Sequence, residues 1–119
     1  MKIMESIIEQ KSFRFAIRIV NLCRHVRSTK KEYTLSEQQL LRSETSIGAN
    51  ITEAQQAQNK ADFVSKLSIA LKEASETKYW IRLLHATEYL SAQEYQSICA
   101  DCTEIEKILV ASIKTAKAE

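Results

Sequence analysis

The sequence predicts an all-α protein: an antiparallel up-down-up-down four-helix bundle formed by a single domain, residues 1–119. Three observations support this prediction. The 119-residue chain has no proline and only one glycine, so it contains few residues that interrupt helices. Apolar residues recur at helical spacing in four successive segments, joined by short connections. Its 45% apolar and 27% charged residues are those of an ordinary globular domain.

The first predicted helix covers about residues 7–28 and is apolar over more than half of its circumference. This apolar surface is wider than one packing face requires, so we expect the helix to contact neighbours on two sides. One side would face the bundle core and the other a second subunit. We assign Phe15, Ile19 and Leu22 to the subunit interface. The helix carries two neighbouring apolar stripes. The first consists of Phe13, Ala16, Ile17, Val20 and Cys23, and the second of Phe15, Ile19, Leu22 and Val26.

The second predicted helix covers about residues 36–57. Ser36 and Gln39 have the spacing of a capping box at its start. Glu44 falls on the apolar stripe of this helix, so we expect it at the bundle end or in an ion pair. Gly48 lies mid-helix among small residues, which predicts close approach of another backbone, with a break in the helix as the alternative.

The third and fourth helices are predicted at about residues 60–89 and 91–116. Ser91 and Glu94 form a second capping-box pattern before the fourth helix. The later half of the third helix carries an apolar patch beside its inward stripe. Aromatic residues favour protein contacts, so we expect this patch to form part of the subunit interface. Its members are Tyr79, Trp80, Leu83 and Leu90, and we assign the first three to the interface.

Positive charge is concentrated at the start of the chain. Residues 1–31 hold eight Lys and Arg against two Glu. A solvated basic face is one explanation, and an anionic partner such as RNA is the other. Repetition of this basic face around a symmetric ring would strengthen its field. The candidate nucleic-acid-binding residues are Arg14, Arg18, Arg24, His25, Arg27, Lys30 and Lys31.

Patterns that carry catalysis or bind cofactors are missing from the sequence. Neither of the two histidines belongs to a Glu-x-x-His motif of a di-iron bundle, and there is no glycine-rich phosphate loop. Cys99 and Cys102 have the spacing of a zinc or redox half-site, but both fall on a core stripe, where cysteine packs as a small hydrophobe. We therefore predict no enzyme activity, cofactor, metal or small-molecule substrate. The uneven cysteine number and the lack of a long apolar run predict a cytoplasmic protein without membrane contact.

Three motifs resemble the 23S rRNA intervening-sequence protein family, also called the S23 or four-helix-bundle protein family. They are SIGANITEA at residues 46–54, LSIALKE at residues 67–73 and ETKYW at residues 76–80. The resemblance extends over nearly the whole chain. Many members have proline and glycine where this chain has Gly48 and Ala54, so we expect the second helix to run more smoothly here.

The resemblance implies a helical bundle that assembles as a homopentameric ring and is encoded within, or is similar to proteins encoded within, intervening sequences of bacterial 23S rRNA genes. Weak RNA binding through the basic first helix is the function that we expect. A similar fold in the accessory protein of diversity-generating retroelements implies the alternative, an adaptor that recruits a reverse transcriptase.

Overall fold

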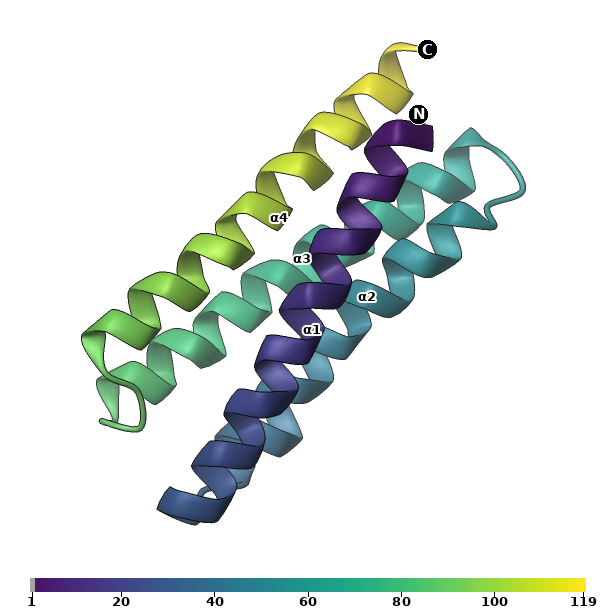
Figure 1. Ribbon diagram of the computed structural model, residues 1–119. Coiled ribbons are helices and arrows are strands. Elements are labelled where there is room, and N and C mark those ends of the chain that lie inside the picture. The colour runs from purple at the N-terminus through teal and green to yellow at the C-terminus, as the bar shows by residue number, and fades with distance from the viewer. Residues whose placement is uncertain (1) are drawn as a thin grey trace.

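The computed structural model describes the backbone of residues 2–119 and the side chains of residues 7–119. Within this range the chain folds into four long helices that run up and down in turn, with both termini at the same end (Figure 1). The body is elongated, 47 × 22 × 19 Å. The predicted all-α four-helix fold is confirmed. The helices are α1 (Lys2–Lys30), α2 (Leu41–Gln55), α3 (Lys60–Ala86) and α4 (Ala92–Ala118), with a short π-helix, η1 (Thr34–Leu40), before α2.

Each helix contributes one buried stripe to a continuous core. Helix α1 packs against α2 and α4, and so does α3, which places α1 and α3 at opposite corners of the bundle. The stripes predicted for the second, third and fourth helices form most of this core. Side chains at its centre, including Ile47, Ile81 and Leu109, have no exposed surface.

The two apolar stripes of α1 exchange their predicted places. The stripe assigned to the subunit interface lies in the core, and the other is partly exposed. Phe15, Ile19 and Leu22 are only 2%, 0% and 8% exposed, because α1 presents them to the core. This corrects their assignment to a subunit interface, since they have almost no surface left for a second chain. The open part of the other stripe includes Phe13, 68% exposed, and Ile17, 48% exposed.

The entry into α2 also differs from the prediction. Ser36 is buried and lies within η1, and its side chain caps no helix. The carboxylate of Glu32 accepts the free amides instead, from Leu35 at 2.7 Å and from Ser36 at 2.9 Å. The Ser36 hydroxyl donates to the carbonyl of Glu32. The predicted capping box at Ser36 and Gln39 is therefore wrong, because the helical segment already begins at Thr34 and Glu32 accepts the Ser36 amide.

The capping box at the start of α4 is confirmed. The Ser91 hydroxyl accepts from the Glu94 amide at 3.1 Å, and the Glu94 carboxylate accepts from the Ser91 amide at 2.9 Å. Helix α3 begins at Lys60 as predicted, after a cap by the Asn59 side chain. It ends at Ala86, earlier than predicted, and Glu88 in the following turn takes a left-handed conformation (φ 69°).

Loss of the Ser91 cap is expected to weaken the bundle. Ser91→Ala should lower the free energy of unfolding by about 1 kcal/mol, because one amide of the first turn loses its acceptor. Chemical denaturation measures the effect. Ser68→Ala, at an exposed position inside α3, is the matched control and should change stability by less than about 0.5 kcal/mol. Equal effects of the two changes would show that the cap contributes nothing.

Candidate functional site

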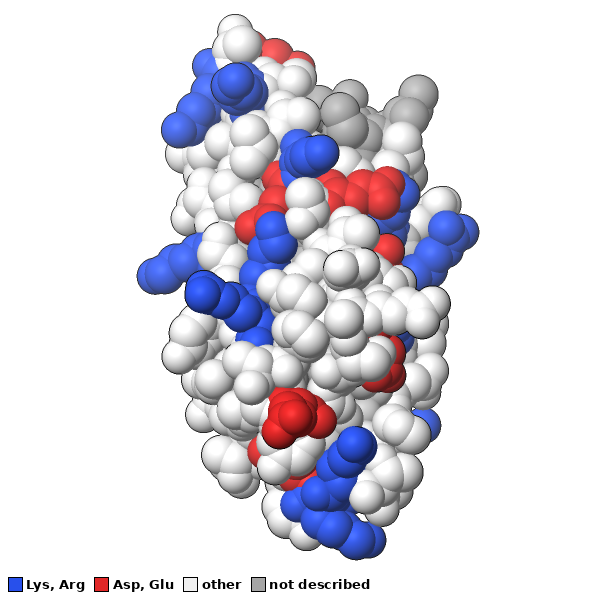
Figure 2. All heavy atoms as spheres, turned by 90° about the vertical axis from the view of Figure 1, so that its left-hand side faces the viewer, with Lys and Arg blue, Asp and Glu red and all other residues white. Residues whose placement is uncertain are grey.

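The seven residues predicted to bind nucleic acid do not form one surface. Arg24, His25, Lys30 and Lys31 are exposed near the end of α1. Figure 2 shows Lys and Arg gathered at the lower tip of the molecule, the end at which α1 finishes in Figure 1. Arg14 is also exposed, but it precedes Arg24 by ten residues, roughly 15 Å along the helix. It therefore belongs to a different part of the surface.

Two members of the predicted set are held by neighbouring side chains. The Arg18 guanidinium donates to Asp101 at 2.7 Å and to Ser97 at 2.8 Å, which ties α1 to α4. The Arg27 guanidinium donates to both carboxylate oxygens of Glu37, at 2.6 and 2.8 Å, and so ties α1 to η1. Both charges are locally neutralised. The cations most available to a phosphate are therefore those at the end of α1.

Three of these exposed residues, Arg24, His25 and Lys31, line an open groove of about 650 Å³. Tyr33 lies in the same groove and is 46% exposed. The guanidinium carbon of Arg27 lies 5.2 Å from the centre of the Tyr33 ring, a cation–π distance that holds the ring beside the basic residues. The groove thus combines positive charge with an accessible aromatic ring. Its lining residues are Arg24, His25, Arg27, Ser28, Lys31 and Tyr33.

Tyr33 is the member of this site that the charge pattern alone did not identify. Its signal in the sequence is its position shortly after Lys30 and Lys31, in the segment KKEY. Proteins that bind single-stranded nucleic acids combine basic residues with aromatic side chains in this way.

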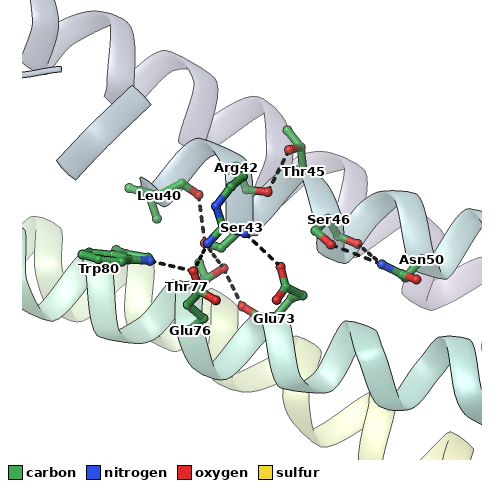
Figure 3. Close-up of polar contacts among 10 residues, drawn as sticks. All are labelled: Leu40, Arg42, Ser43, Thr45, Ser46, Asn50, Glu73, Glu76, Thr77 and Trp80. Atoms are coloured by element: carbon green, nitrogen blue, oxygen red, sulfur yellow. Dashed lines mark hydrogen bonds and ion pairs between the residues drawn. The ribbon is translucent and has the colours of Figure 1, made fainter. Parts of the chain in front are cut away.

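The apolar patch predicted on the third helix is partly open. Tyr79 is 54% exposed, whereas Trp80 and Leu83 are half-buried. The Trp80 indole donates to Glu76 at 3.0 Å (Figure 3). The Trp80 ring meets that of Tyr79 edge to face, with centroids 5.0 Å apart. Glu76 also pairs with Arg42 of α2. Trp80 is therefore fixed within its own chain, and Tyr79 offers most of the free apolar surface.

The small residues of α2 let it pack closely against both neighbouring helices. A side chain at Gly48 would place its Cβ 3.4 Å from the Ser12 hydroxyl of α1, so the two helices come close at this point. On the other side, the Ser43 and Thr77 hydroxyls form a buried hydrogen bond of 2.9 Å between α2 and α3 (Figure 3). Helix α2 continues without a break through Gly48. The predicted close approach is confirmed, and the alternative of a break is wrong.

A second open groove, of about 630 Å³, lies between the first half of α1 and the middle of α2. Phe13 and Ala16 of α1 and Gly48, Ala49 and Ile51 of α2 form its apolar walls. We call it the α1–α2 groove. Its polar lining residues are Glu9, Gln10, Ser12, Arg14, Glu44, Thr45 and Thr52.

Glu44 lines this groove but has no exposed surface. Neither carboxylate oxygen has a hydrogen-bond partner. Burial raises the pKa of Glu44 from its usual 4.5 to about 7, because water no longer stabilises the charged form. Glu44 was expected at the bundle end or in an ion pair. The structure corrects both expectations, since the residue lies buried in the first turn of α2 without a partner.

The cysteines are held in or against the core. Burial raises the pKa values of Cys23 and Cys102 to about 12 and also raises that of Cys99. The Cys102 thiol donates to the carbonyl of Ala74, and that of Cys23 donates to the carbonyl of Ser36. Thiols of this kind are poor nucleophiles, because the reactive thiolate is suppressed. They pack as small apolar groups.

In the part of the chain whose side chains are described, no three His, Cys, Asp or Glu residues lie close enough together to hold a metal ion. None of the helices described above combines the length and the apolar character needed to cross a bilayer.

Comparisons with known proteins identify a family. The profile of a family described as 23S rRNA-intervening sequence protein matches residues 4–111. A solved structure from Bacteroides thetaiotaomicron VPI-5482, described as a protein with unknown function from the S23 ribosomal protein family, is 53% identical. The match covers 93% of this chain and 98% of that one, with a TM-score of 0.91. No curated protein gives a significant match.

Proposed function

This chain belongs to the 23S rRNA-intervening sequence protein family, and we propose that it is a non-enzymatic, ring-forming protein that binds single-stranded RNA at the end of α1. The observation that carries the proposal is the groove in which Arg24, His25 and Lys31 surround the exposed ring of Tyr33. Cations attract the phosphate backbone, and an aromatic ring stacks on an unpaired base.

Assembly into a ring supplies the affinity that one subunit lacks. A few phosphate contacts give weak binding, whereas several basic ends on one particle bind the same strand together. Each subunit offers two separate apolar surfaces for assembly. One is the stripe of Phe13 and Ile17 on α1, and the other is the patch around Tyr79 on α3.

The positions of these two surfaces favour a head-to-tail contact. Because α1 and α3 lie at opposite corners of the bundle, one subunit can present its α3 patch to the α1 stripe of the next. Contacts between two different patches generate rings or filaments. We take the assembly to be a closed ring of five subunits, as the resemblance to the family implies.

Titration of a fluorescein-labelled single-stranded RNA oligonucleotide, followed by anisotropy at 50 mM and 200 mM salt, tests the proposal. Reversal of two exposed charges of the groove, Arg24→Glu with Lys31→Glu, should weaken binding at least about tenfold at 50 mM salt, because phosphate contacts are lost. The matched control, Lys114→Glu with Lys117→Glu on exposed positions of α4, changes the net charge equally and should have an effect below about threefold.

The aromatic contribution is tested in the same assay. Tyr33→Ala should lose at least about fivefold in affinity, whereas Tyr33→Phe should bind like the unmodified protein, because stacking needs the ring and not the hydroxyl. Equal losses in the α1 and α4 charge variants would place the interaction elsewhere. Absence of RNA binding would favour the adaptor for a reverse transcriptase instead.

A further inference from the structure

Arg27 differs from the other cations of the groove at the end of α1, which we call the basic groove, because a carboxylate already holds it. One of its guanidinium nitrogens donates to both carboxylate oxygens of Glu37, at 2.6 and 2.8 Å. Arg24 and Lys31 line the same groove and take part in none of the ion pairs formed within residues 7–119. A phosphate would therefore meet Arg24 and Lys31 as free charges, and Arg27 as one that is already paired.

The Arg27 guanidinium also lies over the ring of Tyr33. Its carbon is 5.2 Å from the ring centre, so a cation covers one face of the ring. Tyr33 is nevertheless 46% exposed. The free surface of the ring is thus its other face and its edges, and a base can stack on one side only.

The backbone of Tyr33 is fixed as well as its ring. Its carbonyl accepts from the amides of Glu37, at 2.9 Å, and Gln38, at 3.1 Å, where η1 begins. Glu37 therefore anchors Tyr33 twice, directly through its amide and indirectly through the carboxylate that holds Arg27. A ring that is already in place loses less conformational freedom when a ligand stacks on it, and this favours binding.

We propose that Arg27 and Glu37 form a clamp that holds Tyr33 ready to stack on one unpaired RNA base. Arg24 and Lys31 then bind the phosphates of the same strand. The inference rests on the proposed RNA binding and names the form of RNA that the groove takes. Because Arg27 blocks one face of the ring, Tyr33 cannot enter a duplex between two base pairs, where both of its faces would have to stack. Arg27 is a positioning residue and makes no phosphate contact.

Removal of the clamp without a change in net charge tests this role. Arg27→Gln combined with Glu37→Gln removes one charge of each sign, so a purely electrostatic site would bind RNA as before. We expect the affinity for the fluorescein-labelled RNA to fall at least about threefold at both 50 mM and 200 mM salt, because the freed ring must be ordered on binding. The same change should cost less than about 1.5-fold in a Tyr33→Ala background and the full amount in a Tyr33→Phe background.

The salt dependence of binding distinguishes a positioning residue from a phosphate contact. Loss of one phosphate contact on a single strand flattens the slope of log affinity against log salt concentration by about 0.7. Arg24→Gln should show this change, whereas the clamp variant should keep the slope of the unmodified protein. An unlabelled long RNA duplex should compete at least about tenfold less well than the single strand at 200 mM salt, because its bases offer no free face.

The results that would overturn the clamp leave RNA binding itself intact. They are an unchanged affinity of the clamp variant, equal losses with and without the Tyr33 ring, a flattened salt slope, or a duplex that competes as well as the single strand. If the unmodified protein binds no RNA, the proposed function is wrong and the clamp falls with it. The Arg27 side chain is 57% exposed, so its removal should leave the bundle folded, which circular dichroism verifies.

Discussion

Glu44→Leu is expected to raise the free energy of unfolding of the isolated subunit by about 3 kcal/mol at pH 8 and by much less at pH 5. The wild-type carboxyl is buried without a partner, and its pKa is raised from 4.5 to about 7. A shift of this size corresponds to roughly 3 kcal/mol between the two protonation states. Leucine fills similar space and carries no charge to desolvate.

The direction of the pH dependence follows from proton binding. The folded subunit holds the Glu44 proton more tightly than the unfolded chain, so it is most stable where Glu44 is protonated. Stability should fall as the pH rises from about 4.5 to about 7 and then level off. Cys23 and Cys102 keep their protons through this range, because their pKa values are about 12.

Urea denaturation at pH 5 and pH 8 measures the difference, in a Tyr79→Glu background that keeps the subunits apart. Glu44→Gln is the matched control. It removes the ionisation but leaves an unpaired amide in the core, so it should abolish the pH dependence with a smaller gain in stability. A Glu44→Leu variant that is less stable at pH 8, or equally shifted at both pH values, would show that the carboxyl is paired or hydrated.

Charge placed on either assembly surface is expected to convert the ring into monomers. Phe13→Glu places a charge in the α1 stripe of every subunit, and Tyr79→Glu places one in the α3 patch. Each should raise the dissociation constant at least about a hundredfold, since a charge in the apolar centre of an interface is left unpaired. Val110→Glu, at a position of α4 that is 43% exposed, is the control and should leave the mass unchanged.

Mixing the two variants distinguishes a head-to-tail contact from a symmetric one. The Phe13→Glu subunit keeps an intact α3 patch, and the Tyr79→Glu subunit keeps an intact α1 stripe. In a head-to-tail assembly they should therefore form one-to-one heterodimers and stop there. A mixture that remains monomeric would argue against pairing of the α1 stripe with the α3 patch.

Features with a local cause could be predicted from the sequence. The Ser91 and Glu94 pair forms a capping box from neighbouring residues, and the structure contains it. The same pattern at Ser36 failed, because η1 begins at Thr34 and buries Ser36, whose amide donates to Glu32. The pattern shows what a serine can do, but it does not show where the helical segment begins in the folded chain.

Features that depend on which neighbour a helix face meets could not be predicted. Both stripes of α1 are apolar, so periodicity could not show that Phe15 lies in the core while Phe13 remains exposed. The same holds for Glu44, whose burial depends on the angle between α1 and α2. For the basic groove, the charge skew indicated α1, whose last residues line it. It could not separate free cations from Arg18 and Arg27, whose carboxylate partners lie on other elements.

Native mass spectrometry of the unmodified chain at micromolar concentration tests the central claim most directly. A head-to-tail ring predicts one dominant species with the mass of five copies of the 13.6 kDa chain. It also predicts that dilution yields monomers, because all contacts in the ring are equivalent. A species of 13.6 kDa at every concentration, or a dimer that does not grow, would contradict the ring and with it the joint display of basic ends to RNA.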